Sequence, residues 1–220
     1  MIPKTFYITY KEYNNIVDSR IESIKKHNPN HNVYFYDDIA CNEFFAREFP
    51  PDYQNTFKKI KHGAHKADFF RYCIIYKYGG YYIDMDNIIK TDVSDITNNC
   101  SMVTCLITGR AKQYRNDNLY SGKHIHQGLL ASAPKSKIIQ KLIEHMIQNP
   151  KPVETSYAPL AYHMYVRYFY KLLLDHTNNT QLYVNSTYNI GNESVYLIDA
   201  QDTSIMLRGV HVPWKRNYNV

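Results

Sequence analysis

The sequence predicts an α/β fold in which a mostly parallel central sheet is flanked by helices. Segments with the alternating pattern of strands and segments with the 3.6-residue spacing of helices follow one another from the N-terminus. Of the 220 residues, 44% are hydrophobic and 15% are aromatic, which is enough to build a packed core. The sequence contains no internal repeat, linker or shift in composition, so we expect one domain over residues 1–220.

The N-terminal half contains the clearest element signals. Its strand segments are β-branched and aromatic, and its helical segments repeat apolar residues at helical spacing. Asp37 is a typical N-cap, Pro50-Pro51 ends the helix that follows it, and Gly79-Gly80 stops the next one. The expected elements are a strand at 4–10, a helix from 16 to 27, a strand at 32–36, a helix from Asp37 through Phe45, a helix at 62–78 and a strand at 81–83.

The C-terminal half is less regular. Two further strands are expected around a polar stretch at 109–122, which has the length of an active-site loop. Two amphipathic helices follow, and each is entered through a proline. The expected elements are strands at 102–108 and 125–131, helices at 135–147 and 160–174, and short strands at 181–184, 195–198 and 209–212.

Cysteine spacing and charge exclude several classes of protein. The four cysteines fit neither paired zinc ligands nor a dense disulfide framework, so we expect reduced thiols. The net charge of +6 is spread over short clusters, whereas nucleic-acid binders gather basic residues on one face, so no nucleic-acid partner is expected. No apolar run reaches the roughly 18 residues of a membrane span, and the N-terminus lacks the pattern of a secretory signal.

Two carboxylates follow the short strand at 81–83. Asp84 and Asp86 are one residue apart, so on an extended backbone they point the same way at the carboxyl edge of the sheet, where α/β proteins bind ligands. A pair of oxygen donors there suits Mg²⁺ or Mn²⁺, which can in turn hold a diphosphate. The alternative is an ordinary turn at the end of a strand, where aspartate is common.

The preceding helix carries a second charged pair. Asp68 and Arg71 are three residues apart and share a face, and the Gly79-Gly80 turn brings that helix beside the strand that ends at Asp84. A carboxylate and a forked guanidinium are suited to gripping sugar hydroxyls and a phosphate oxygen. The alternative is an exposed ion pair of little energetic consequence.

These residues form a recognisable signature. The patterns A-D-x-x-R-Y (67–72) and G-G-x-Y-x-D-x-D (79–86), with 16 positions from Asp68 to Asp84, resemble the DxD-containing glycosyltransferases of the sugar-binding-region type. That family includes initiating α-1,6-mannosyltransferases, α-1,4-galactosyltransferases and the core of clostridial glucosylating toxins. The resemblance implies a GT-A type fold and a metal-dependent enzyme that uses Mn²⁺ or Mg²⁺. Its implied donor is a nucleoside-diphosphate sugar, with a UDP-sugar favoured, and its implied acceptor is a hydroxyl of a glycan or glycoprotein.

The resemblance also implies roles for individual residues. Ile2-Pro3-Lys4, Ile125 to Pro134 and Val210 to Trp214 are weaker matches to other family segments, and they extend the assignment over most of the chain. The implied metal ligands are Asp84, Asp86 and His211. The implied donor-binding residues are Ile8, Thr9, Tyr10, Asp68, Arg71, Tyr82, Asp84 and Trp214. Asp84 and Asp86 are also the expected catalytic residues. On the side of the acceptor, the candidates for a catalytic residue are Gln127 and Glu154.

Two other functions compete with this interpretation. An aspartyl-nucleophile phosphohydrolase also places a DxD pair after a buried strand, although there the pair comes near the start of the chain. A non-catalytic glycan- or nucleic-acid-binding domain would fit the charge and the aromatic content. The compact, anchor-free sequence resembles glycosyltransferases of bacterial capsule clusters and of large DNA viruses, which predicts a cytoplasmic enzyme, in the host cytoplasm if it is viral.

Overall fold

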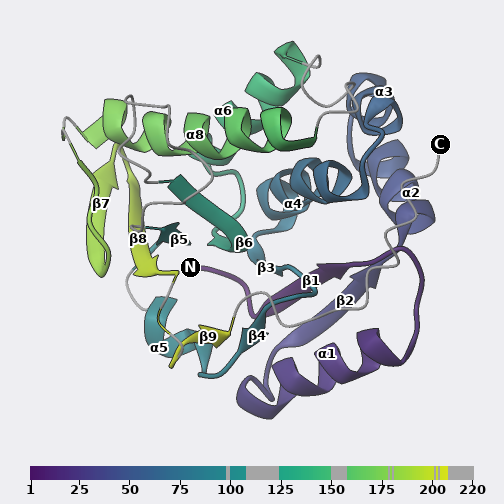
Figure 1. The fold of residues 1–220 in the computed structure, drawn as a ribbon, viewed down its shortest axis with the longest axis horizontal. Helices are drawn as coiled ribbons and strands as arrows, with labels where there is room; N and C mark the ends of the chain where they lie inside the picture. The colour runs from purple at the N-terminus through teal and green to yellow at the C-terminus, as the bar shows by residue number, and fades with distance from the viewer. Residues whose placement is uncertain are drawn as a thin grey trace.

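The computed structural model describes residues 1–97, 100–107, 124–149, 158–177, 179, 181–200, 202 and 204–207. Its centre is a seven-stranded sheet with the order β2-β1-β3-β6-β5-β8-β7 (Figure 1). The strands are β1 (Thr5–Thr9), β2 (Asn32–Tyr36), β3 (Gly80–Ile83), β5 (Met102–Ile107), β6 (His124–Ser132), β7 (Ser186–Ile190) and β8 (Glu193–Asp199). A second, two-stranded sheet pairs β4 (Ile88–Ile89) with β9 (Met206–Leu207).

The central sheet is mixed, which corrects the expectation of a mostly parallel one. The pairs β1–β2, β1–β3 and β5–β8 are parallel, whereas β3–β6, β5–β6 and β7–β8 are antiparallel. The expectation failed because β6, which runs antiparallel to both of its neighbours, is buried along most of its length. A strand that is buried on both faces has the same apolar pattern in either direction, so the sequence does not reveal its orientation.

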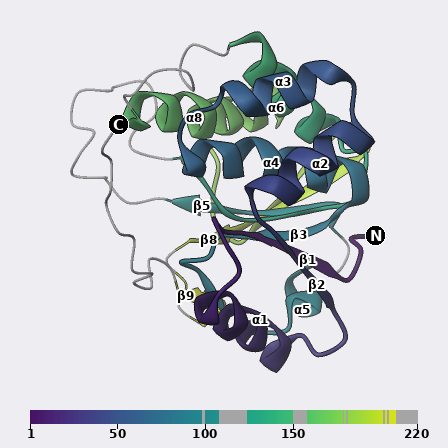
Figure 2. The same cartoon turned by 90° about the vertical axis from the view of Figure 1, so that its right-hand side faces the viewer.

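Helices cover both faces of this sheet. The helices are α1 (Asn15–His27), α2 (Asp38–Glu48), α3 (Pro51–Lys59), α4 (Gly63–Tyr78), α5 (Val93–Thr97), α6 (Lys137–Gln148) and α8 (Ala158–Thr177). Figure 2 shows α2, α3, α4, α6 and α8 on one side, and α1 and α5 on the other, where β9 also lies. Each side has its own buried cluster, which contains Phe44, Phe69 and Phe70 on the first side and Ile8, Val17 and Ile24 on the second.

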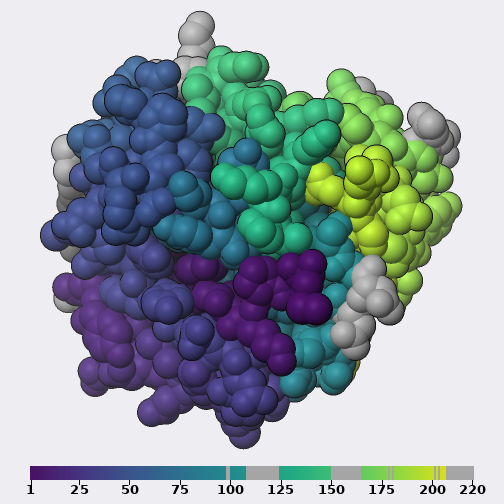
Figure 3. Space-filling view, turned by 180° about the vertical axis from the view of Figure 1, so that it is seen from behind, coloured from purple at the N-terminus to yellow at the C-terminus, as the bar shows by residue number. Residues whose placement is uncertain are grey.

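Local signals in the sequence explain the helix ends. The Asp37 side chain accepts a hydrogen bond from the Ala40 amide at 2.8 Å, as expected of the N-cap of α2. Gly79 ends α4 with φ of 68°, and a Cβ there would come within 2.8 Å of both Pro3 and Pro134. The N-terminal segment, purple in Figure 3, fills the middle of the back face between the blue and green parts of the chain.

Several expectations need revision or stay open. Helix α3 was not expected, and Pro51 begins it rather than only ending α2. The strand predicted at 181–184 is wrong, because β7 begins only at Ser186, after a turn in which Asn185 has φ of 52°. The loop at 109–122 and the strand at 209–212 lie outside the described residues. Among the residues that are described, no helix combines the length and apolar character needed to cross a membrane.

Candidate active site

The two aspartates of the DxD pair lie where β3 ends. β1 and β3 are parallel neighbours, so the end of β1 at Thr9 and the end of β3 at Ile83 reach the same edge of the sheet. The turn after β3 is held by main-chain bonds, from the Asp84 amide to the Gly128 carbonyl at 2.9 Å and from the Asn87 amide to the Asp84 carbonyl at 3.0 Å. The predicted placement of the pair at a carboxyl edge is therefore what the structure has.

Arg71 joins the DxD pair to helix α4. Its Nη2 lies 2.8 Å from Asp84 Oδ1 and 3.0 Å from Asp68 Oδ1, and its Nη1 donates to the main-chain carbonyl of Gln127. Arg71 is 3% exposed and Asp68 is 4% exposed, so the alternative of an exposed ion pair is wrong. The Asp68 carboxylate is also within 3.4 Å of the His65 ring through its second oxygen.

The pKa of Asp84 reflects this crowded site. Burial raises it most, Arg71 opposes that rise, and the neighbouring carboxylates of Asp86 and Asp68 add to it, which brings the pKa of Asp84 to about 6. The side chain still has 29% of its surface exposed, on the side that faces the cavity described next. Asp84 is therefore ionised at neutral pH but takes up a proton in mild acid.

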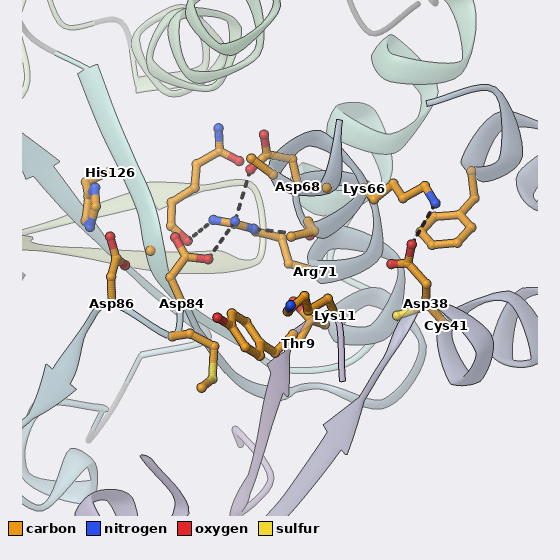
Figure 4. A pocket seen from close by; sticks show the side chains of 18 residues that line it. Thr9, Lys11, Asp38, Cys41, Lys66, Asp68, Arg71, Asp84, Asp86 and His126 are labelled. Atoms are coloured by element: carbon orange, nitrogen blue, oxygen red, sulfur yellow. Dashed lines mark hydrogen bonds and ion pairs between the residues drawn. The ribbon is translucent and has the colours of Figure 1, made fainter. Parts of the chain in front are cut away.

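A cavity of about 290 Å³ opens over this edge of the sheet. Figure 4 shows Asp86 and His126 at one end, Arg71 with Asp84 and Asp68 in the middle, and the ion-paired Asp38 and Lys66 at the other. Thr9 and Lys11 lie along the lower wall. Residues from β1, β6, α2, α3 and α4 and from the turn after β3 thus converge on one space, as expected of a ligand site in an α/β protein.

The strand residues predicted to bind the donor have different exposures. Thr9 and Tyr10 line the cavity, whereas Ile8 is 0% exposed and offers only its main chain. Tyr82 is buried beneath the site, where its hydroxyl is 2.7 Å from Thr9 Oγ1 and its ring centre is 4.7 Å from the Arg71 guanidinium carbon. Tyr82 thus supports Arg71 from below.

Gln127 lies in the wall of the cavity on β6. It is 2% exposed, and its Oε1 accepts a hydrogen bond from the Tyr72 hydroxyl. Its Nε2 has no hydrogen-bond partner among the residues of known placement, so a buried amide donor is left for a ligand. The other predicted residues of the acceptor and metal sites, Glu154, His211 and Trp214, lie outside the part of the chain that the structure describes.

Some residues at the cavity were not predicted from the sequence. Asp38 and Lys66 form an ion pair of 2.8 Å across the gap between α2 and α4, and such a contact has no local sequence signal. Gly128 does have one, because it interrupts an apolar strand. A Cβ at Gly128 would overlap the side chains of Asn87 and His126, so a larger residue beside the DxD turn would have to displace them.

The donor set at the DxD pair fits a divalent cation. No group of three or more His, Cys, Asp or Glu side chains gathers around one point within the described ranges, so the site offers two carboxylates, Asp84 and Asp86. Mg²⁺ is commonly bound by one or two carboxylates together with substrate phosphates and water. Oxygen ligands of this kind suit Mg²⁺ and Mn²⁺ better than the softer metals.

Comparison with known proteins identifies the region around this site. Residues 15–102 match the model of the glycosyltransferase sugar-binding region containing the DXD motif. An uncharacterized glycosyltransferase of Acanthamoeba polyphaga mimivirus, L373, is 27% identical over 112 residues, which are 51% of this chain and 41% of the relative. The mannosyl phosphorylinositol ceramide synthase CSH1 of Saccharomyces cerevisiae is 34% identical over 91 residues, 40% of this chain and 23% of the relative. The chain therefore spans less than half the length of these relatives.

A solved structure supports the fold. The PaToxG glycosyltransferase superposes with a TM-score of 0.50 over 79% of this chain and 68% of its own, at 14% sequence identity. A likeness at this level of identity concerns the fold alone. The prediction of an α/β fold of the GT-A type is confirmed.

Proposed function

We propose that this chain, whose residues 15–102 are a sugar-binding region of the DXD-containing glycosyltransferase type, transfers a sugar from a nucleoside-diphosphate sugar to a hydroxyl of a glycan or glycoprotein. The observation that carries the proposal is the buried Asp68–Arg71–Asp84 network beside an open cavity, with Asp86 next to it. A fold does not need this arrangement, because buried ion pairs contribute little net stability. The free-energy cost of burying these three charged groups is explained if the network holds Asp84 in place for a ligand.

The donor would occupy the cavity along its length. Thr9 and Tyr10, at the end of β1, would contact the nucleoside together with the main chain of Ile8. Asp68 would accept hydrogen bonds from sugar hydroxyls, since its carboxylate reaches the cavity wall. Arg71 has its guanidinium occupied by two carboxylates and a carbonyl, so its main role is to orient Asp68 and Asp84. We favour a UDP-sugar as the donor.

Asp84 and Asp86 would hold the divalent cation, Mn²⁺ or Mg²⁺. A bound cation supplies positive charge that stabilises the departing diphosphate. Asp86 would be its direct ligand and Asp84 a direct or water-mediated one, while His211 is the candidate for a further ligand. Arg71 contacts Oδ1 of Asp84, and the Tyr82 hydroxyl also interacts with this carboxylate, so Asp84 would be held in place for the cation or its water.

The acceptor side has two candidates with different chemistry. Gln127 cannot ionise, so it could only orient a substrate group or stabilise positive charge at the sugar, which suits transfer with retention of configuration. Glu154 is a carboxylate and could act as the base that inversion requires. The configuration of the new glycosidic bond, read from the anomeric proton by NMR, separates these roles.

The test is a panel of UDP-, GDP- and TDP-sugars, screened for nucleotide release that depends on Mn²⁺. The panel should include mannose, because the CSH1 relative is named for mannosyl transfer. Asp86→Ala should abolish release while the protein stays folded, and Asp95→Ala, at an exposed position of α5, is the matched control. Hydrolysis of phosphomonoesters without use of any nucleotide sugar would instead support the phosphohydrolase alternative.

A further inference from the structure

His126 lies in the wall of the cavity beside Asp86. Figure 4 shows the two side chains next to each other at one end of the cavity, and His126 is one of its lining residues. It is half-buried on β6, so part of its surface is open to a ligand that occupies the DxD end. In the donor site proposed above, this imidazole has no role.

Strand β6 departs from regular pairing at this residue. Leu130 is paired with Thr104 of β5. The next pair along β5 joins Cys105 to His126, so residues 127–129 of β6 lie opposite a single step of the neighbouring strand. Bulges of this kind change the direction of side chains and are common next to active sites. This bulge lies where β6 contributes its residues to the cavity.

The side chain of Asn87 fixes which nitrogen of the imidazole carries the proton. Its Nδ2 is 2.9 Å from the main-chain carbonyl of Gly128, and a carbonyl only accepts, so this atom of the amide must be the nitrogen. The same nitrogen is 3.4 Å from Nε2 of His126. An amide nitrogen only donates, so Nε2 is the acceptor, and the proton of the neutral ring is on Nδ1.

This tautomer suits a phosphate oxygen better than a metal ion. A metal ligand must be an unprotonated nitrogen, but Nε2 is turned toward Asn87, and a Cβ at Gly128 would come within 2.5 Å of it. Within the described ranges, His126 also does not complete a group of three metal-binding side chains with Asp84 and Asp86. A protonated Nδ1 can donate to a negatively charged oxygen, and a neutral ring does not repel a divalent cation.

We propose that His126 binds the diphosphate of the donor, by donating a hydrogen bond from Nδ1 to a phosphate oxygen next to Asp86. The lysines and the arginine that line the described part of the cavity are already in ion pairs with carboxylates, so a diphosphate needs other donors. A hydrogen bond to a charged phosphate is stronger than one between neutral groups. The inference rests on the proposed function, because it takes a nucleoside-diphosphate sugar as the ligand.

Three variants of His126 test the inference through the positions of their nitrogen atoms. His126→Leu removes both ring nitrogens, His126→Asn keeps an amide nitrogen near the place of Nδ1, and His126→Gln keeps one near the place of Nε2. Calorimetry at pH 8, where Asp84 is ionised, measures the binding of Mn²⁺ alone and of pyrophosphate, UDP and GDP with Mn²⁺. We expect the affinity for the three phosphate compounds to fall at least about tenfold in His126→Leu and His126→Gln, because a hydrogen bond to a charged group is lost. His126→Asn should restore most of it, and Mn²⁺ alone should bind equally to all variants.

The other possible roles of His126 give different results. Weaker binding of Mn²⁺ alone by His126→Leu would mean that the imidazole ligates the cation or positions Asp86. A lower melting temperature with unchanged pyrophosphate affinity would mean that its role is structural, and equal weakening in His126→Asn and His126→Leu would mean that Nδ1 is not the donor. Each of these results overturns the proposal.

The control is His176→Leu, which removes an exposed imidazole from α8 and should leave every affinity unchanged. The same measurements keep the inference apart from the function on which it rests. If the wild-type protein binds neither UDP nor GDP in the presence of Mn²⁺, the proposed function itself is wrong. If the wild type binds them and His126→Leu binds them equally well, only the role of His126 is wrong.

Discussion

Replacing Arg71 by methionine should destabilise the protein far more than replacing an exposed arginine. The substitution keeps the length of the side chain but leaves Asp68 and Asp84 without their shared cation, which lies 3.0 and 2.8 Å away. It also removes a donor to the main-chain carbonyl of Gln127 and the packing of the guanidinium over the Tyr82 ring. Asp68 would then be buried with the His65 ring close to it, and Asp84, which is partly exposed, would keep the Tyr82 hydroxyl but lose its cation.

The size of the effect follows from burial. Breaking a buried pair by removing one partner costs about 3 to 5 kcal/mol. Because 29% of the Asp84 side chain is exposed and can recover some hydration, we expect the lower end, about 3 kcal/mol at pH 8. For a protein of this size, that corresponds to a decrease in melting temperature of roughly 6 to 12 °C.

The measurement is urea unfolding of the wild type and the variant at pH 8 and pH 5. Arg71 opposes the rise in the pKa of Asp84, so its loss should raise that pKa further, and Asp84 should be neutral at pH 5. The destabilisation should therefore be smaller at pH 5 than at pH 8. The control is Arg47→Met, which breaks an ion pair at a side chain that is 63% exposed and should cost under about 1 kcal/mol. A loss below 1 kcal/mol for Arg71→Met at pH 8, or a larger loss at pH 5, would refute the reasoning.

The remaining predictions concern the same site. Gly128→Ala should cost about 1 to 3 kcal/mol of stability and weaken Mn²⁺-dependent UDP binding, because the new methyl group would overlap Asn87; calorimetry measures both, and an unchanged affinity would contradict it. Mn²⁺ affinity should fall by up to about tenfold per pH unit below about pH 6, because a proton on Asp84 must leave first, and a flat titration from pH 7.5 to 5 would exclude this. The same raised pKa, from 3.8 to about 6, makes the folded state bind more protons than the unfolded one, so the contribution of Asp84 to the stability of the metal-free protein should decrease as the pH rises through that interval. Tyr82→Phe should cost only about 0.5 to 1.5 kcal/mol in thermal unfolding, since it loses the bond to Thr9 but keeps the ring under Arg71, and a cost above 3 kcal/mol would contradict that division.

The fold was most predictable where its signals are local. Asp37 and Gly79 mark the ends of helices through their own backbone and side-chain chemistry, so α2 and α4 were expected within a few residues. The direction of β6 was not predictable, because it depends on which neighbours the strand meets in space. The pairing of β4 with β9 joins residues more than a hundred positions apart through strands of two residues each, which is too short for any periodicity.

The candidate site divides in the same way. Asp84 and Asp86 were predicted together because one strand carries both, and Asp68 and Arg71 because one helix does. The Asp38–Lys66 pair arises only when α2 packs near α4, so nothing in either segment indicates it.

The charges at the DxD edge explain why metal and donor should bind together. Asp68, Asp84 and Asp86 carry one negative charge more than Arg71 and Arg20, and this excess contributes to the raised pKa of Asp84. A divalent cation reverses the sign and makes the edge attractive to a diphosphate. Asp86→Ala should therefore remove the metal-dependent part of pyrophosphate binding and leave the residual binding without metal intact or stronger. Weaker pyrophosphate binding by Asp86→Ala in the absence of Mn²⁺ would contradict this account of the charges.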